Sequence, residues 1–542
     1  MSSQKAFVGV DVGTGSARAG VFDVSGNLLA IAKRNITMWH EAGDVVEQSS
    51  DQIWQAVCES VREAVAVSSV SPTRIAGIGF DATCSLVVVK KDGAPLTVSP
   101  SGDPKRNIIV WMDHRSAREA EEINAGKHDV LRYVGGRISP EMETPKLLWL
   151  KRNLPKSFDS ADYFFDLPDF LTWRASGALD RSICTVTCKW TYLAHEKRWD
   201  ENYFMNIGLA ELANEGFASI GTSIVAPGTA LAKGLTTQAA SDLGLPKGTA
   251  VGASLIDAHA GGVGTLGGKV GEQDLPIENR LAYIFGTSAC SMASTKEPVF
   301  VNGVWGPYFS AMIPGLWLNE GGQSAAGAAI DHLVEMHPAA GKAKAHAQAA
   351  GLSLVAWLDR QVQSKSKNLS DAIDLAGNIH VVPEFLGNRS PFAEPDARAI
   401  IAGLGLENNV ESLLSQYVAG LSGIGYGLKQ LLNKFASKGI DIKLIVASGG
   451  AAHSSLVCQI LADATETSVS LSNTTEPVLL GSAMLAAVAS GHCSGLGDAM
   501  RDMSGASRVF KPGNGEHQLN HSRRFRAFEV LQSAGCEIRK IY

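Results

Sequence analysis

The chain has 542 residues, 45% of them hydrophobic and 19% charged, which is ordinary for a soluble globular protein of two to four domains. Its net charge of −6 and the lack of any basic block argue against a nucleic-acid partner. No stretch approaches the ~20 uninterrupted apolar residues of a membrane span, and the N-terminus lacks the apolar run of a signal peptide. We therefore expect a cytoplasmic protein with no membrane partner.

The eight cysteines are scattered along the chain. Cys184 and Cys188 come closest to a motif, but no second pair follows at a metal-ligand spacing, so zinc is not expected. Free thiols in a reducing cytosol are the better interpretation. Composition leaves the oligomeric state open, a homodimer included.

A glycine-rich loop lies near the start of the chain. The apolar run at 8–12 predicts a buried strand that leads into Gly13-Thr14-Gly15-Ser16. Two further strands are expected at 18–24 and 28–32, joined by a turn that contains glycine, so we predict a β-hairpin. Rossmann and Walker loops instead open a helix, so neither fits.

This first loop has the composition of a phosphate-binding loop. Gly13 and Gly15 allow the backbone to approach phosphate oxygens and to aim N–H groups at them. Thr14 and Ser16 add hydroxyl donors, and Asp11 at the strand end could hold Mg²⁺ through water. A tight hairpin whose glycines serve only the turn is the alternative.

The pattern of the first loop returns in the second half of the chain. The helical spacing at 51–67 and the strand-like run at 75–80 indicate an α/β layer architecture. A strand is then predicted at 281–285, followed directly by Gly286-Thr287. The polyphosphate of a nucleotide needs binding groups on both sides. The repeat therefore favours two similar domains, 1–265 and 266–542, that face one cleft. The glycine-rich stretch 262–275 fits such a boundary.

Asp257 is the candidate general base. It stands between an apolar run and a glycine-rich stretch, where strand ends meet a cleft. A carboxylate at such a place can accept a proton from a hydroxyl that attacks phosphorus. Residue chemistry alone supports equally well an Asp257 that caps a helix. The nearby His259 is by itself more typical of a packed or capping histidine.

Two further segments carry chemistry with an equally plain structural alternative. Trp111, Asp113 and Arg115 would give a polyol a flat apolar face, a carboxylate and a guanidinium; an amphipathic strand end with a surface Asp113–Arg115 pair is the alternative. The segment 448–454, with Gly449 and Gly450, predicts a flat surface for an adenine ring, and close helix–strand packing explains it as well.

These segments, in this order, resemble the FGGY carbohydrate kinases of the sugar kinase, actin and chaperone ATPase superfamily. The resemblance runs from about Phe7 to about Gly491 and implies two ribonuclease-H-like domains with ATP and a sugar or polyol in the cleft between them. It implies nucleotide contacts at Asp11, Gly13, Thr14, Gly286, Thr287, Gly327, Gly450 and Ser454, the last often Asn in the family. It further implies that Asp257 is the catalytic base and that Trp111, Asp113 and Arg115 face the sugar.

The resemblance also bears on the substrate. Glycerol kinases carry an Arg-Glu pair where this chain has Ala82-Thr83, and xylulose kinases carry a Gln-Met-His-Gly stretch that is absent here. The run from Thr83 and Cys84 to Val87 looks like the ribulokinase branch, which implies D-ribulose as substrate and contacts from Thr83 and Cys84. Ribitol and L-ribulose are close alternatives, and glycerol a more distant one. An ATPase of the actin or chaperone type, or an inactive sugar sensor, would keep the loops without sugar transfer.

Overall fold

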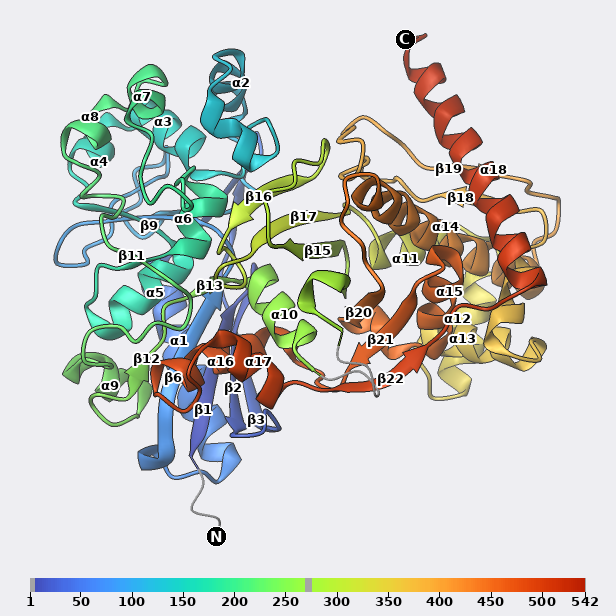
Figure 1. Cartoon of the computed structure of the whole chain (residues 1–542), viewed down its shortest axis with the longest axis horizontal. Coiled ribbons are helices and arrows are strands. Elements are labelled where there is room, and N and C mark those ends of the chain that lie inside the picture. Colours follow the sequence, from blue (N-terminus) through green and yellow to red (C-terminus); the bar gives the residue numbers. More distant parts are fainter. Residues whose placement is uncertain (1–4, 269–274, 542) are drawn as a thin grey trace.

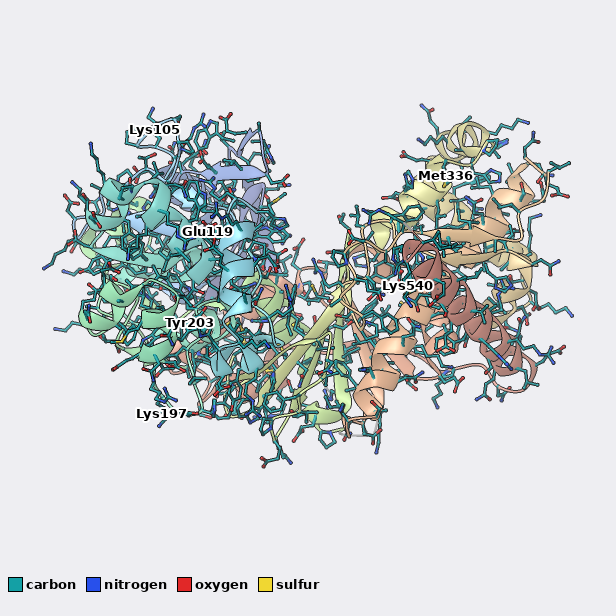
Figure 2. The ribbon with its side chains drawn as sticks, turned by 90° about the horizontal axis from the view of Figure 1, so that it is seen from above. Lys105, Glu119, Lys197, Tyr203, Met336 and Lys540 are labelled. Atoms are coloured by element: carbon teal, nitrogen blue, oxygen red, sulfur yellow. The ribbon has the colours of Figure 1, made fainter. Side chains whose placement is uncertain are left out.

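The computed structural model describes residues 5–268 and 275–541 of the chain. They form two lobes, each built around a mixed β-sheet (Figure 1). Seen with its side chains, the molecule has Lys105 on one lobe and Met336 on the other, and the lobes diverge between them (Figure 2).

The sheet of the first lobe has the order β12-β6-β1-β2-β3, and β13 also pairs with β6. Strands β1, β2 and β3 are antiparallel neighbours, whereas β6 runs parallel to β1 and to β12. The hairpin, the helix and the parallel strand predicted from the sequence are confirmed. The bounds are β1 (Ala6–Val12), β2 (Ser16–Asp23), β3 (Leu28–Asn35), α1 (Ser50–Ser68), β6 (Ile75–Ala82), β12 (Ala250–Val251) and β13 (Leu255–Ile256).

The sheet of the second lobe repeats this plan in the order β16-β17-β15-β14-β20-β21-β22. Strands β14, β15 and β17 are antiparallel neighbours, and β20 runs parallel to β14 and to β21. The expectation of two similar halves is thus confirmed. The bounds are β14 (Arg280–Phe285), β15 (Ala289–Thr295), β16 (Trp305–Phe309), β17 (Trp317–Gln323), β20 (Leu444–Ser448), β21 (Ser468–Ser472) and β22 (Ala506–Phe510).

Each lobe carries further elements around its repeated sheet (Figure 1). The first lobe adds a sheet of order β4-β5-β8-β7-β9: β4 (Trp39–Glu41), β5 (Val45–Gln48), β7 (Leu86–Val89), β8 (Ile108–Ile109) and β9 (Tyr163–Asp166). Its helices include α2 (Ala117–Ala125), α3 (Glu143–Asn153), α5 (Leu167–Ser176) and α6 (Ile183–Lys189). The second lobe adds α11 (Gly327–Glu335), α13 (Leu354–Lys365), α14 (Val410–Ala436), α15 (Ser455–Thr465) and α18 (Glu516–Arg539).

Two helices join the lobes by crossing at close range. Helix α10 (Asp257–Leu266) leads out of the first sheet, and α16 (Pro477–Ala489) returns from the second half of the chain to cover β1 and β6. A Cβ atom built on Gly481 would lie 2.0 Å from the carbonyl oxygen of Ala260, so the two backbones touch directly. Figure 1 shows α16 beside the first sheet, followed by α17 (Leu496–Met503). A division at residue 265 stays a prediction, because α16 lies beyond that residue yet packs on the first sheet.

Among the residues described, none of the helices is both long and apolar enough to pass through a lipid bilayer.

We predict that Gly481→Ala lowers the free energy of unfolding by about 1–3 kcal/mol, because the added methyl group would overpack the contact between α16 and α10. The matched control is Gly497→Ala in α17, where a Cβ would meet nothing within 4 Å. There the better helix propensity of alanine should leave stability unchanged or slightly raised. Urea denaturation of both variants gives the comparison, and equal stabilities would contradict the backbone contact.

Candidate active site

Residues of both lobes line one cavity of about 340 Å³, the inter-lobe cavity. The first glycine loop, the start of α10 and the middle of β17 contribute to its lining. A second cavity of about 620 Å³, the second-lobe cavity, lies against the second glycine loop and between α11, α13, α14 and α15. The inter-lobe cavity is lined by Asp11, Gly13, Thr14, Arg18, Thr83, Cys84, Trp111, Glu141, Lys189, Ile256, Asp257, Ala258, His259, Ile284, Ser288, Cys290, Trp305, Glu320, Arg389 and Val478.

The first glycine loop is a tight hairpin turn between β1 and β2. The N–H of Gly13 donates to the carbonyl of Ser16 at 3.0 Å. The indole N–H of Trp111 donates to Thr14 Oγ1 at 3.0 Å, and the Gln48 amide donates to the Thr14 carbonyl at 2.7 Å. Gly13 and Thr14 face the cavity, whereas Gly15 does not line it. The turn is therefore held both by its own backbone and by two side chains from outside the hairpin.

Carboxylates gather beside this loop. Arg18 bridges two of them, with 2.9 Å from its Nε to Asp11 Oδ2 and 2.7 Å from a terminal nitrogen to Glu476 Oε2. Asp81 is fully buried, and burial together with the charge of Asp11 raises its pKa well above the usual range. With Asp257 nearby, the carboxylates outnumber the one arginine, so this corner of the cavity attracts cations.

Asp257 is the first residue of α10 and faces the inter-lobe cavity. The N-cap residue is Ile256, and the Asp257 carboxylate accepts from the next backbone N–H, that of Ala258, at 2.7 Å. Asp257 is therefore not the N-cap residue, but it does bind a first-turn N–H, and its role as a base stays a prediction. Burial, and then the negative charge of Asp11, raise the pKa of Asp257 to about 6. A carboxylate with that pKa is ionised at neutral pH and is a stronger base than a solvated one.

The remaining wall of the inter-lobe cavity is rich in charge. Thr83, Cys84 and Trp111 line it, as the resemblance implied. Sequence reasoning missed five charged residues that also line it: Arg18, Glu141, Lys189, Glu320 and Arg389. They come from separate elements, so no local motif signals them. The Trp305 ring lies 5.9 Å from Lys189 Nζ and 5.4 Å from the Arg389 guanidinium carbon. Donors, acceptors and indole faces together suit a ligand with many hydroxyl groups.

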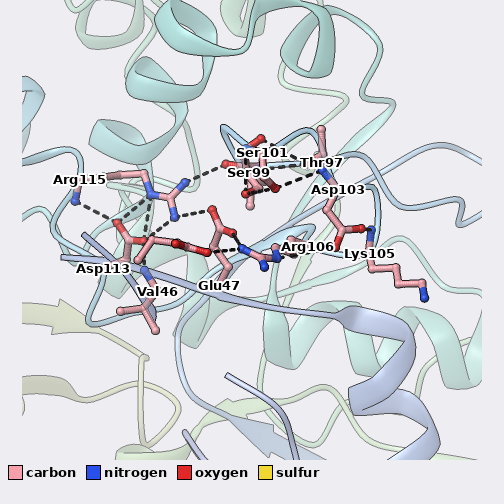
Figure 3. Close-up of polar contacts among 12 residues, drawn as sticks. Val46, Glu47, Thr97, Ser99, Ser101, Asp103, Lys105, Arg106, Asp113 and Arg115 are labelled. Carbon is pink, nitrogen blue, oxygen red and sulfur yellow. Dashed lines mark hydrogen bonds and ion pairs between the residues drawn. The ribbon is translucent and has the colours of Figure 1, made fainter. Parts of the chain in front are cut away.

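The sequence-based placement of Asp113 and Arg115 against the sugar is not supported. Neither residue lines the cavity; their side chains are 0% and 2% exposed and form a buried ion pair at 2.6 Å (Figure 3). Arg115 also pairs with Glu47 at 2.9 Å, and Asp113 accepts from the N–H of Val46 at 2.6 Å. The alternative of a surface pair is wrong as well, because the pair is buried and binds Val46 and Glu47 of β5 inside the lobe.

The second glycine loop has the same three-residue form as the first. It spans 286–288 between β14 and β15, as 13–15 does between β1 and β2. The N–H of Gly327, the first residue of α11, donates to the Gly286 carbonyl at 3.0 Å, and a Cβ there would lie 2.7 Å from that oxygen. Gly286, Thr287 and Gly327 line the second-lobe cavity, so this loop and the start of α11 face it together.

The far end of the second-lobe cavity has a wall of small and apolar residues, with Gly450 and Ser454 among its lining. Gly449 lies behind it with a φ of 90°, where a Cβ would fall 2.6 Å from the Phe285 carbonyl oxygen. The Ser454 hydroxyl caps α15 by accepting from the N–H of Val457 at 3.1 Å. Sequence reasoning missed Asp359, which lines this cavity and accepts from the Tyr417 hydroxyl at 2.7 Å.

The residues present fit a nucleotide with Mg²⁺. A glycine turn and a helix start are suited to phosphate oxygens, and both line the second-lobe cavity, where the N–H groups of Gly327 and Ala328 already donate to the carbonyls of Gly286 and Thr287. The carboxylate of Asp11 supplies the hard oxygen ligand that Mg²⁺ prefers. The surplus of negative charge around Arg18 favours a cation there.

Two lobes with repeated hairpin loops, facing a charged cavity and a second cavity beside a helix start, define a phosphotransferase fold of the actin and sugar kinase type. Residues 6–264 match the N-terminal domain of the FGGY family of carbohydrate kinases, and residues 281–490 match its C-terminal domain. The chain therefore belongs to the FGGY family of carbohydrate kinases.

Individual relatives agree with this assignment. The chain is 45% identical to an FGGY carbohydrate kinase domain-containing protein of Homo sapiens, over 94% of this chain and 93% of that protein. It is 39% identical to a D-ribulokinase of Saccharomyces cerevisiae, over 90% of this chain and 72% of that protein. Among solved structures, a xylulose kinase from Rhodospirillum rubrum superposes with a TM-score of 0.78 at 20% identity, covering 98% of this chain and 99% of that one.

We predict that Asp113→Ala lowers the free energy of unfolding by about 3–5 kcal/mol, because it strips the buried Arg115 of one of its two carboxylates. The KM of the remaining folded enzyme for its sugar should not change. Asp103→Ala is the control, since Asp103 belongs to the same polar network but is 39% exposed (Figure 3). Denaturation curves measure the stability and sugar titrations the KM. A raised KM at unchanged stability would support a sugar-binding role for Asp113.

Proposed function

We propose that the chain transfers the γ-phosphoryl group of ATP to a terminal hydroxyl of a pentulose, D-ribulose, giving D-ribulose 5-phosphate. One observation carries the reaction type: Asp257, a carboxylate with a raised pKa, faces a charged inter-lobe cavity into which the first glycine loop also projects. The similarity to a D-ribulokinase over most of the chain supports a pentulose as acceptor.

In the proposed reaction Asp257 accepts the proton of the attacking hydroxyl as the oxygen approaches phosphorus. Backbone N–H groups of the two hairpin loops bind phosphate oxygens on opposite sides, and Thr14 and Thr287 add hydroxyl donors. Mg²⁺, held near Asp11 directly or through water, would offset the negative charge of the phosphates. Closure of the two lobes around both ligands would exclude water and so suppress ATP hydrolysis.

Acceptor recognition falls to side chains of the inter-lobe cavity. Lys189 and Arg389 can donate to sugar oxygens, and Glu141 and Glu320 can accept from hydroxyl groups. Thr83 and Cys84 contribute a small polar and a small apolar surface at the end of β6. Glycerol fits less well, since Ala82-Thr83 lack the charged pair expected of a glycerol kinase. Ribitol is the reduced form of D-ribulose and L-ribulose is its mirror image, with the same chain length and the same set of functional groups, so they are the nearest alternatives.

An acceptor panel tests the substrate. Purified enzyme with ATP and Mg²⁺ should release ADP with D-ribulose at a kcat/KM at least ~10-fold above that for ribitol, L-ribulose, D-xylulose and glycerol, a margin worth about one correctly placed hydrogen bond. Mass spectrometry should find one phosphate added per ADP released. Equal ADP release with and without acceptor, with no sugar phosphate, would instead support an ATPase of the actin or chaperone type.

Asp257→Asn should lower kcat by at least ~10²-fold while ATP affinity stays within a few-fold, because the amide keeps the shape but cannot accept the proton. The wild-type kcat/KM should be flat above pH 6 and fall tenfold per unit below it, since a base with a pKa near 6 is inactive once protonated. Asp242→Asn, at a partly exposed carboxylate that accepts from the Trp54 indole and lines neither cavity, is the control. Full turnover in Asp257→Asn would refute the role of this residue.

A further inference from the structure

A buried chain of hydrogen bonds reaches Glu320 from behind the inter-lobe cavity. The Sγ atom of Cys184 lies 3.0 Å from His259 Nδ1, and His259 Nε2 lies 3.1 Å from Glu320 Oε2. Cys184 is 0% exposed, and the side chain of His259 is 2% exposed. The sequence had left His259 as a packed or capping histidine; the structure gives both of its ring nitrogens a partner.

The partners fix where the imidazole carries its protons. A carboxylate only accepts hydrogen bonds, so His259 Nε2 must carry a hydrogen that it donates to Glu320. Cys184 occupies the other nitrogen, so the ring cannot turn to another partner there. Loss of the sulfur would remove the partner that holds Nδ1, so the ring could turn away from Glu320.

The charges of Cys184, His259 and Glu320 strengthen these hydrogen bonds. Burial opposes ionisation of Cys184, but the hydrogen bond from Cys188 and the charge of His259 outweigh it and lower the thiol pKa to about 5. Burial likewise disfavours a charged His259, yet Cys184 and Glu320 raise its pKa to about 10. These opposite pKa shifts favour a negative Cys184 beside a positive His259, so charge strengthens the hydrogen bonds that link Cys184, His259 and Glu320.

The hydrogen bonds among Cys184, His259 and Glu320 connect three elements that meet at the inter-lobe cavity. Cys184 lies on α6, His259 on the first turn of α10 and Glu320 on β17 of the second lobe. Asp257 begins the same turn of α10, two residues before His259. The orientation of the Glu320 carboxylate is thereby tied to the helix that carries the base.

We propose that Cys184 and His259 are positioning residues, which hold the Glu320 carboxylate in the orientation that binds the hydroxyl groups of the acceptor sugar. The proposal rests on the proposed function, since it takes the inter-lobe cavity as the sugar site. A zinc ion shared by Cys184, Cys188 and His259 is the competing use of these atoms, which lie within 4.8 Å of one another. Tetrahedral zinc would hold its sulfur and nitrogen ligands about 3.5 Å apart, whereas 3.0 Å is a hydrogen-bond length.

Two substitutions of His259 separate positioning from simple packing. In His259→Gln the side-chain amide can reach the place of Nε2 and still donate to Glu320, whereas in His259→Asn the amide can replace only Nδ1. We expect KM for the pentulose to rise about tenfold or more in His259→Asn and in Cys184→Ala, the loss expected when a charged group loses its hydrogen-bond donor. KM should stay within a few-fold of wild type in His259→Gln, and KM for ATP should not change in any variant. Cys58→Ala, which removes another buried thiol from α1, should behave as wild type.

Nitrogen-15 NMR of the histidine rings shows, without any substrate, which ring nitrogen of His259 carries a hydrogen. Wild-type enzyme should show a proton on His259 Nε2 in a strong hydrogen bond, and Cys184→Ala should weaken that hydrogen bond because the ring loses its second partner. Equal KM values in the Gln and Asn variants, an unprotonated Nε2, or one zinc per chain in the purified enzyme would each overturn the proposal. A wild-type enzyme that phosphorylates no pentulose or pentitol would instead sink the proposed function, and the sugar-binding part of this inference with it.

Discussion

The crossing of α10 and α16 is the contact on which the site depends. Both helices begin at the inter-lobe cavity: Asp257 is the first residue of α10, and Glu476 precedes α16 and pairs with Arg18. Arg18 in turn holds Asp11 at the end of β1. Because the backbones of the helices touch at Gly481 and Ala260, little sliding is available without separating these groups. One packing contact thus sets the spacing between the base, the first loop and the carboxylates around it.

That spacing brings several carboxylates close together, which disfavours their ionisation. Burial is the main cause of the raised pKa values of Asp81 and Asp257, and the nearby charge of Asp11 raises both further. A single arginine offsets part of the repulsion. In the proposed function the remaining negative charge would attract a cation, and the raised pKa of Asp257 would suit it to proton transfer. The arrangement is stable only because helix packing holds it together.

Sequence reasoning succeeded where structure is local. The hairpin loops at 13–15 and 286–288 follow from apolar runs broken by glycine, and the repeat predicted two similar lobes. It failed at Asp113 and Arg115, because their burial depends on β5 and on Glu47, far away in the chain. Glu141, Lys189, Glu320 and Arg389 gave no signal for the same reason: each is an isolated charge until the fold brings them together. The choice of Asp257 over a capping role needed the family resemblance, and the structure supplied the geometry.

The two ligands are served by different parts of the chain. In the proposed function phosphates would meet mainly the two hairpin loops, whose backbone tolerates many sequences; the fold itself is shared with a xylulose kinase at 20% identity. The acceptor meets side chains from several elements, and single substitutions there can change the substrate while the fold stays intact. Under the proposed function, substrate choice would reside in the charged wall of the inter-lobe cavity and in the buried groups that contact it. A residue such as Cys184, which touches no ligand, can then influence specificity as much as one that does.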